Sequence, residues 1–258
     1  MFYSNGKIAL IIFVTLMGVI GYLSFGLDSK DEITISVIEI NGNNYLPKNE
    51  YFEYANLQDK IEYKLLTLSL IRDRFQKHPY IQRVNVEYTG DGKVVVDITE
   101  KEIKALLLTD GNRFLVTKEM EILPLLEHSQ NINFPVVQTS TTGKKMVPLQ
   151  FAKSNSELKL SFKILMAAKL LNPSLYDNLS EIDLRNGKNA VIYFSSVDYP
   201  VILGRENEIK KMVVFEKLWE SIGTVQANKL LEYVDLRFTD KVYIGIAGEN
   251  LQVEETQS

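Results

Sequence analysis

The sequence contains no cysteine, and among its 258 residues there are only two histidines and one tryptophan. The absence of cysteine excludes disulfide bonds, thiolate nucleophiles and cysteine-ligated zinc together. It leaves the compartment open, because a cysteine-free chain suits the cytosol and the cell envelope alike. Catalysis and metal binding therefore have few candidate residues.

The chain also lacks an excess of positive charge. Its 29 Lys and Arg residues face 33 Asp and Glu residues, which gives a formal net charge of -4. Nucleic-acid binding needs a concentrated basic surface, so we predict no nucleic-acid partner. The hydrophobic fraction of 45% is sufficient for real cores, and the length allows one or two domains plus an anchor.

The sequence also lacks the motifs of common enzymes: H-E-x-x-H, G-x-S-x-G, the P-loop and G-x-G-x-x-G are all absent. Three pairs of glutamates two residues apart do occur, Glu100 with Glu102, Glu119 with Glu121, and Glu206 with Glu208. Such spacing does not establish the cross-cleft geometry of a glycosidase. His78 precedes Pro79 and is expected to cap the carbonyls of a helix end, and His128 is expected in a polar loop. We predict no enzyme, no catalytic residue, no cofactor and no metal site.

One long apolar run occupies residues 8–27, IALIIFVTLMGVIGYLSFGL, and carries no charge. As a helix it would be about 30 Å long, the thickness of a bilayer's hydrocarbon core. A cleaved signal peptide is the alternative, but its apolar stretch is shorter and ends in an A-x-A triplet, which is absent here. We predict a cytoplasmic tail at 1–7, a transmembrane helix at 8–27 and a linker at 28–34. The positive-inside rule places the bulk of the chain outside the cytoplasm.

Residues 35–101 predict a small α+β unit of β-α-α-β-β order. A β-branched run at 35–40 is followed by a helix that begins near Pro47. The second helix runs from Thr67, which can cap it, to His78. Alternating apolar residues over 84–98 then predict a hairpin with one buried face.

Residues 102–247 predict a strand-rich mixed domain with two helices. Strands are expected at 105–108, 113–116, 134–137, 182–184, 191–194, 201–203, 233–238 and 242–246. The first helix is expected to begin at Ser154, which forms a capping box with Glu157. The second is expected from Glu206 onward, with Trp219 in the core. Residues 248–258 are expected to be a flexible tail.

A short pattern occurs twice. Ile182-Asp183-Leu184-Arg185 and Val234-Asp235-Leu236-Arg237 each precede a turn and an apolar strand, which predicts two hairpins on one sheet. Four tyrosines lie near these late strands: Tyr193, Tyr199, Tyr233 and Tyr243. Tyrosines at a sheet edge can cover the sheet or form a docking surface, and we favour docking.

This layout resembles the FtsQ/DivIB family of bacterial cell-division proteins, in which a POTRA domain precedes a β domain. The likeness rests on residues 37–43, 71–81, 84–88, 94–100, 234–238 and 244–246. Two departures indicate a divergent branch. The segment at 100–103, Glu-Lys-Glu-Ile, lacks the family's proline, and Thr117 to Met120 replaces an Asp-x-x-Gly turn.

The resemblance implies a non-catalytic scaffold in the cytoplasmic membrane at the division septum. Members bridge early and late divisome proteins, and their last strands pair with a segment of FtsB, which forms a coiled coil with FtsL. The family's contact motif falls here on Arg237, Phe238, Asp240, Lys241, Tyr243 and Ile246.

Elementary physics supports such a site independently. A strand at a sheet edge exposes unpaired N–H and C=O groups to which an extended partner can add a strand. Arg237 is expected beside Asp235 on one face of the strand, with Phe238 on the other as an apolar anchor. The alternative is that Phe238 is core and Arg237 an ordinary surface charge.

Two other functions compete with the scaffold. A POTRA-bearing component of secretion or outer-membrane assembly would carry several such units or a barrel sequence, and neither is present. An anchored envelope hydrolase would need a catalytic constellation that the sequence lacks.

Overall fold

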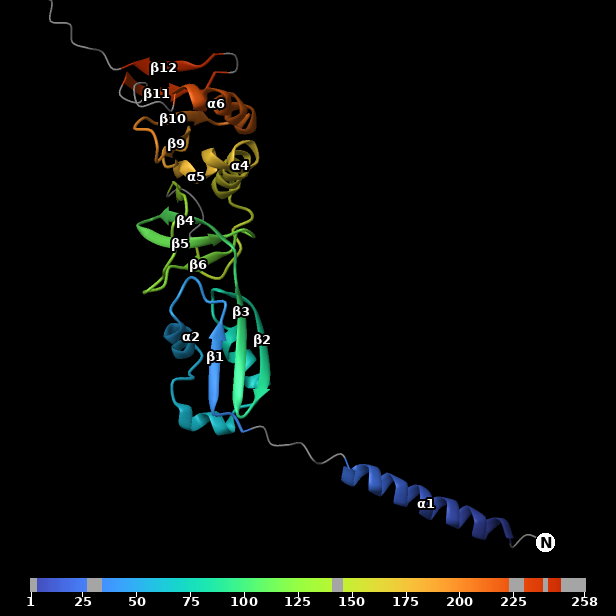
Figure 1. The fold of residues 1–258 in the computed structure, drawn as a ribbon. Coiled ribbons are helices and arrows are strands. Elements are labelled where there is room, and N and C mark those ends of the chain that lie inside the picture. Colours follow the sequence, from blue (N-terminus) through green and yellow to red (C-terminus); the bar gives the residue numbers. More distant parts are fainter. Residues whose placement is uncertain (1–3, 27–33, 141–145, 223–229, 239–240, 247–258) are drawn as a thin grey trace, which may run out of the picture.

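The structure is a computed structural model, and it describes residues 4–26, 34–140, 146–222, 230–238 and 241–246. Helix α1 (Ser4–Gly26) lies apart from the folded remainder of the chain (Figure 1). No helix in the described ranges meets the combined length and apolarity needed to cross a bilayer. Helix α1 nevertheless covers most of the run expected at 8–27. Its role as a membrane span stays a prediction.

The first folded unit has the predicted β-α-α-β-β order. Its elements are β1 (Val37–Asn41), α2 (Lys48–Tyr54), the 3-10 helix η1 (Lys60–Leu65), α3 (Leu68–Gln76), β2 (Ile81–Gly90) and β3 (Lys93–Glu100). The strands form a sheet of order β1-β3-β2, in which β1 runs parallel to β3. Thr67 caps α3 as expected, since its hydroxyl accepts a hydrogen bond from the Leu70 N–H.

His78 does not cap a helix end with its ring, so that expectation was wrong. Helix α3 already ends at Gln76, and the His78 side chain is 3% exposed. Its Nδ1 accepts a hydrogen bond from the Tyr80 N–H, and its ring packs against Tyr51 and Tyr54 with centroids 4.6 Å away. Burial, assisted by nearby Lys101, lowers the pKa of His78 to about 4. The imidazole is therefore a neutral core group.

The second unit is a nine-stranded sheet. Its strands are β4 (Ile103–Thr109), β5 (Asn112–Thr117), β6 (Ile122–Pro124), β7 (Val136–Gln138), β8 (Leu179–Asp183), β9 (Ala190–Phe194), β10 (Val201–Gly204), β11 (Leu231–Asp235) and β12 (Tyr243–Ile246). Their order is β12-β11-β10-β9-β8-β7-β4-β5-β6. The two repeated motifs do form antiparallel hairpins, β8–β9 and β11–β12, of this one sheet.

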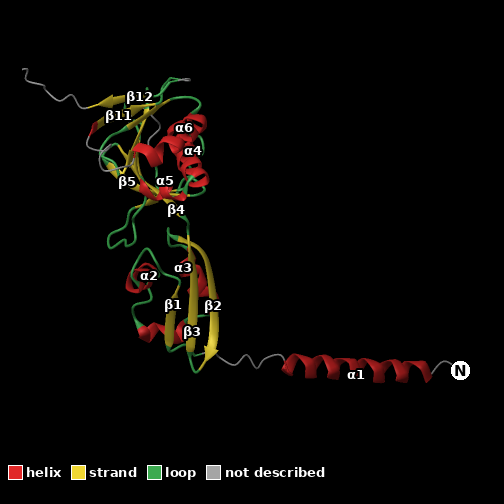
Figure 2. Cartoon of the chain, turned by 45° about the horizontal axis from the view of Figure 1, so that its top comes forward, coloured by secondary structure: helices red, strands yellow, loops and turns green. Residues whose placement is uncertain are grey.

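Three helices of this unit are described, where two were expected. They are α4 (Ser156–Leu171), α5 (Pro173–Asn178) and α6 (Glu208–Ile222). Helix α5 was not expected, because a proline directly after a helical stretch usually marks the end of that helix. Proline also fits the first turn of a new helix, and the Asn172 side chain caps that turn by accepting from the Ser174 N–H. Figure 2 shows α4 and α6 together beside the late strands.

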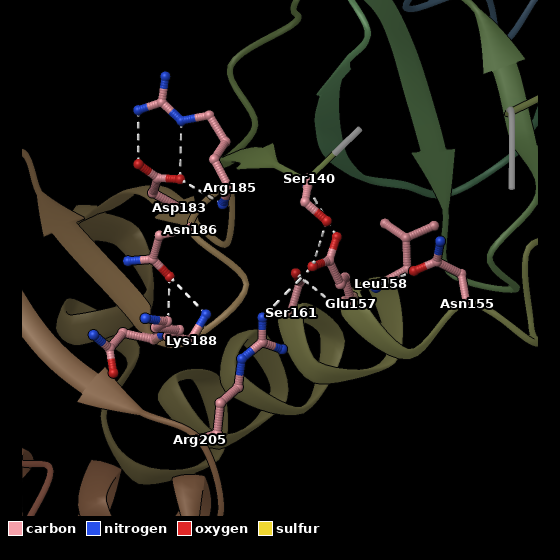
Figure 3. A network of polar contacts seen from close by, with 11 residues as sticks. Ser140, Asn155, Glu157, Leu158, Ser161, Asp183, Arg185, Asn186, Lys188 and Arg205 are labelled. Atoms are coloured by element: carbon pink, nitrogen blue, oxygen red, sulfur yellow. Dashed lines mark hydrogen bonds and ion pairs between the residues drawn. The ribbon is translucent and has the colours of Figure 1, made fainter. Parts of the chain in front are cut away.

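Helix α4 begins one residue later than its predicted capping box requires. Asn155, not Ser154, is the cap, because its side chain accepts from the Leu158 N–H at 2.9 Å. The Glu157 carboxylate instead accepts from the Ser140 N–H at 3.0 Å and lies 3.5 Å from the guanidinium of Arg205 (Figure 3). This carboxylate thus joins α4 to the ends of β7 and β10.

The two units pack directly on one another. Leu115 and Leu123 of the second sheet belong to the hydrophobic core of the first unit. The Tyr80 hydroxyl donates to the Pro124 carbonyl at 2.9 Å, and the Lys101 ammonium lies 2.9 Å from the Glu121 carboxylate. The other core lies under α4 and α6, where Trp219 packs with Phe194 as expected of a core residue.

Candidate partner-binding edge

Strand β12 is the last strand of the nine-stranded sheet. It pairs antiparallel with β11, with Val234 opposite Ile244 and Asp235 opposite Tyr243. Among the described residues, nothing pairs with the opposite side of β12. In Figure 1, β12 lies at the end of the molecule farthest from the first unit. The strand therefore offers backbone N–H and C=O groups to an incoming strand.

The parallel crossover β10–α6–β11 sets the position of this edge. Strand β11 pairs in parallel with β10, with Val201 opposite Val234, and α6 connects the two strands. Val234 and Leu236 are buried and fix β11 on the core. The backbone of Gly204 adopts φ +72, and a Cβ there would lie 2.9 Å from Cγ of Arg237. Glycine at this position lets the Arg237 side chain lie across the end of β10.

Arg237 is held by a multidentate pair with Asp235. Its Nε donates to Oδ1 of Asp235 at 3.0 Å, its Nη2 donates to Oδ2 at 2.6 Å, and its backbone N–H donates to Oδ1 at 3.0 Å. Burial pushes the pKa of Asp235 upward, but the hydrogen bonds from Arg237 outweigh it and the pKa is lowered. The carboxylate is buried while the guanidinium is about half-exposed. Arg237 is thus oriented and still accessible to a second carboxylate.

Beside this pair, two aromatic rings form an accessible apolar patch. Phe238 is 53% exposed, and its ring meets that of Tyr243 edge-on with centroids 4.9 Å apart. Phe238 is therefore not core, and the alternative that buried it was wrong. Ile246, at the far end of β12, is 66% exposed.

A hollow of about 340 Å³ lies between the start of α6 and the β11–β12 connection. Its lining includes five basic residues, Arg205, Lys210, Lys211, Arg237 and Lys241, and one acidic residue, Glu206. Lys211 is engaged, because its Nζ donates to the carbonyl of Leu203 at 3.0 Å. The wall is basic on balance, and Val214 and Phe238 add apolar surface. Such a site suits an acidic segment that also carries apolar side chains.

The structure describes five of the six predicted contact residues, and they lie in two places. Arg237, Phe238 and Lys241 line the hollow, and Tyr243 and Ile246 lie on the edge strand beyond it. Asp240 lies outside the described residues. One expectation needs correction: β11 ends at Asp235, so Arg237 and Phe238 follow the strand and do not alternate across it.

The sequence reasoning missed the part of the wall that α6 supplies. Lys210 and Val214 of α6, with Arg205 just before this helix, reach the hollow only because the crossover brings α6 beside the β11–β12 connection. The adjacent Lys210 and Lys211 were the one available signal, but on a helix they resemble ordinary solvated charges. Tyr199, grouped with the docking tyrosines, is core at 1% exposed, whereas Tyr193, Tyr233 and Tyr243 are exposed.

The other polar clusters have structural roles. Glu100 accepts from the N–H groups of Asn44 and Tyr45 and from the Tyr51 hydroxyl. Glu102 bonds Lys104, and this contact lowers the pKa of the Glu102 carboxyl. Within the described ranges, no three His, Asp or Glu residues are grouped to hold a metal ion.

Comparison with known families agrees with this architecture. Residues 33–101 match the POTRA domain of FtsQ type, and residues 83–237 match the C-terminal domain described as cell division protein FtsQ/DivIB. These two modules in this order define a cell-division protein. The second match covers more than half of the chain, and the protein belongs to the FtsQ/DivIB family.

Curated relatives carry the same names. The chain is 21% identical over 207 residues to cell division protein FtsQ of Geotalea daltonii, covering 80% of this chain and 74% of the relative. It is 20% identical over 210 residues to cell division protein DivIB of Clostridium acetobutylicum, covering 79% of each. FtsQ of Syntrophotalea carbinolica is 22% identical over 230 residues, covering 86% and 78%. None of these names denotes an enzyme, and they favour the divisome over secretion or outer-membrane assembly.

Proposed function

We propose that this protein is a membrane-anchored, non-catalytic scaffold of the divisome that captures a partner segment at β12. The observation that carries the proposal is an outer edge of β12 that no described strand covers, next to exposed Phe238 and a basic hollow. An extended segment adds a strand to β12, and its side chains enter the hollow.

The partner chemistry follows from the wall of the hollow. Arg237 keeps donor capacity beyond its bonds to Asp235, and Lys210 and Lys241 add positive charge. A partner carboxylate beside an apolar side chain would meet both Arg237 and Phe238. Coiled-coil membrane proteins of the FtsB and FtsL type are the partners that the family membership suggests. The proposed contact residues are Arg237, Phe238, Asp240, Lys241, Tyr243 and Ile246.

The anchor belongs to the same proposal. Residues 8–27 cross the cytoplasmic membrane, residues 1–7 lie in the cytoplasm, and 28–34 link the span to the folded part. The POTRA domain occupies 35–101 and the β domain 102–247, and the tail expected at 248–258 lies outside the described residues. The support is the uncharged run of 8–27 and the helical backbone of α1. In this arrangement the folded part works outside the cytoplasm at the septum.

The test of the edge is co-purification of the full-length chain with an FtsB/FtsL-type pair from the same cells. We expect Arg237→Glu with Phe238→Glu to weaken binding at least about 100-fold. The double variant loses both the cation that pairs with a partner carboxylate and the aromatic anchor that the partner buries. Phe238→Glu alone should change the melting temperature little, since this side chain is exposed. Arg237→Glu leaves the buried Asp235 carboxylate without its partner, so the double variant should lose roughly the 1–3 kcal/mol of that ion pair and still fold. Arg185→Glu, in the equivalent ion pair of the β8–β9 hairpin, is the matched control and should leave binding intact. Wild-type binding by the double variant would disprove the site.

A second measurement tests strand addition itself. Because the chain has no cysteine, Ile246→Cys creates its only thiol, on the exposed edge strand. A cysteine series along the partner segment should cross-link to it at every second position, the side-chain period of a strand. A helical period would contradict strand addition and leave only docking in the hollow.

A further inference from the structure

The first unit exposes a second apolar surface, unrelated to β12. On η1, Ile61 is 82% and Leu65 is 84% exposed, more than any other large apolar side chain among the described residues. Leu70, in the first turn of α3, is 38% exposed. We refer to Ile61 and Leu65 of η1 as the base patch. The same helix buries Tyr63, so η1 is anchored to the core while its apolar side chains point outward.

The base patch lies at the anchor end of the unit. Figures 1 and 2 both place η1, cyan in Figure 1, at the end of the first unit from which the chain leads to α1. Strand β1 starts at this end beside the β2–β3 turn, where the Ser36 N–H donates to the Gly92 carbonyl at 2.7 Å. Residues 27–33 connect α1 to the unit, and such a segment spans at most about 25 Å when fully extended.

We propose that the base patch inserts into the interfacial region of the bilayer that α1 crosses. This inference rests on the anchor proposed above. Because the short connection keeps the patch within reach of the membrane surface, even a weak intrinsic affinity is sufficient. Ile61 and Leu65 would enter the acyl boundary. Lys60 and Lys64 would extend their aliphatic stems along it and keep their ammonium groups among the headgroups.

The charges around η1 determine whether contact with the bilayer depends on electrostatic attraction or on apolar insertion. Asp59 caps the helix and Glu62 lies in its first turn, so these two carboxylates offset the charges of Lys60 and Lys64. Attraction to anionic lipid is therefore weak, and apolar insertion has to dominate. The contact should persist in neutral phosphatidylcholine. Its consequence would be a fixed orientation of the first unit, with β12 presented at the end of the molecule away from the membrane (Figure 1).

The cysteine-free chain allows a direct test. Three single-cysteine variants of the full-length chain, Leu65→Cys, Leu170→Cys and Val14→Cys, are labelled with an environment-sensitive fluorophore in phosphatidylcholine nanodiscs. Leu170 is the matched control, because it is 81% exposed on α4 of the second unit. Spin-labelled lipids should quench the label at residue 65 at least about twofold more than the label at residue 170. Ile61→Ser should reduce that difference.

The label at residue 14 separates the two proposals. Quenching at 14 with equal signals at 65 and 170 would overturn the base patch and leave the anchor standing. Quenching at 65 above 170 supports the base patch whatever position 14 does. No quenching at 14 or 65 would overturn both. An emission shift at 65 without lipid quenching would mean that protein covers the patch, which also overturns the bilayer assignment.

Discussion

The β8–β9 and β11–β12 hairpins begin alike but lie in different parts of the sheet. Each has an aspartate at the end of its first strand bonded by an arginine two residues later, Asp183 with Arg185 (Figure 3) and Asp235 with Arg237. Their registers also correspond: Ile182 faces Ile192, and Val234 faces Ile244. Strand β9 is covered on its far side by β10, whereas no described strand covers β12. The same local motif therefore lies inside the sheet in one place and at its described edge in the other.

The largest expected difference between the hairpins is in core packing. Ile192 is fully buried, so Ile192→Ala should lower the free energy of unfolding by roughly 2–5 kcal/mol. The equivalent Ile244 is 41% exposed, and Ile244→Ala should cost less than about 1 kcal/mol. Urea unfolding of both variants measures the difference. Equal losses would mean that β12 is covered in solution, which would contradict the proposed difference between the two hairpins.

The ion pairs should differ by a smaller amount. The Asp235 carboxylate is more buried than that of Asp183, so Asp235→Asn should cost about 1–3 kcal/mol and Asp183→Asn about 1 kcal/mol or less. The pKa of Asp235 is lowered in the folded state. Its stabilisation is therefore present above the unfolded-state pKa of about 3.9 and is lost as pH falls through the folded value.

Unfolding at two pH values tests that sign. The difference in unfolding free energy between wild type and Asp235→Asn should be full at about pH 7 and should shrink as pH falls through the folded-state pKa of Asp235. A difference that stays constant with pH would show that the loss comes from packing and not from the charge.

The smallest expected effect on stability concerns Gly245 of β12, because β9 contains no glycine. Tyr233 lies across from Gly245, and a Cβ at residue 245 would meet the Tyr233 ring. The ring is partly exposed and can move, so Gly245→Ala should cost less than about 1 kcal/mol. In a Tyr233→Ala background the same change should cost nothing, and a double-mutant cycle measures this coupling. Additive effects would refute the cross-strand contact.

Local sequence predicted most of the elements. Thr67 and the apolar stripe after it predicted α3, and alternation around the turn near Gly90 predicted the β2–β3 hairpin. The prediction failed where two local signals coincided. Pro173 both ends α4 and begins α5, and Asn155 beside Ser154 made the cap ambiguous by one residue. The end of β11 was missed because Arg237 and Phe238 continue an alternating pattern after the strand has stopped.

Only part of the candidate site could be predicted from local sequence. The Asp235–Arg237 contact is local, since the two residues are two positions apart, and the sequence alone put them together. The basic wall is not local, because Lys210 and Phe238 line one hollow only through the β10–α6–β11 crossover. The periodicity of polar and apolar residues carries no information about whether a helix will pack beside the connection between two strands.

By itself, the sequence determined the anchor-like run, the order of elements in the POTRA unit and the two Asp-Leu-Arg hairpins, because each depends on neighbours a few residues apart. Only the tertiary structure decided which hairpin lies at the edge, because strand order in a sheet is set by crossovers between distant segments. It likewise decided that Ile61 and Leu65 face outward while Tyr63 between them is buried. Burial depends on which surfaces meet after folding, and that is a property of the whole chain.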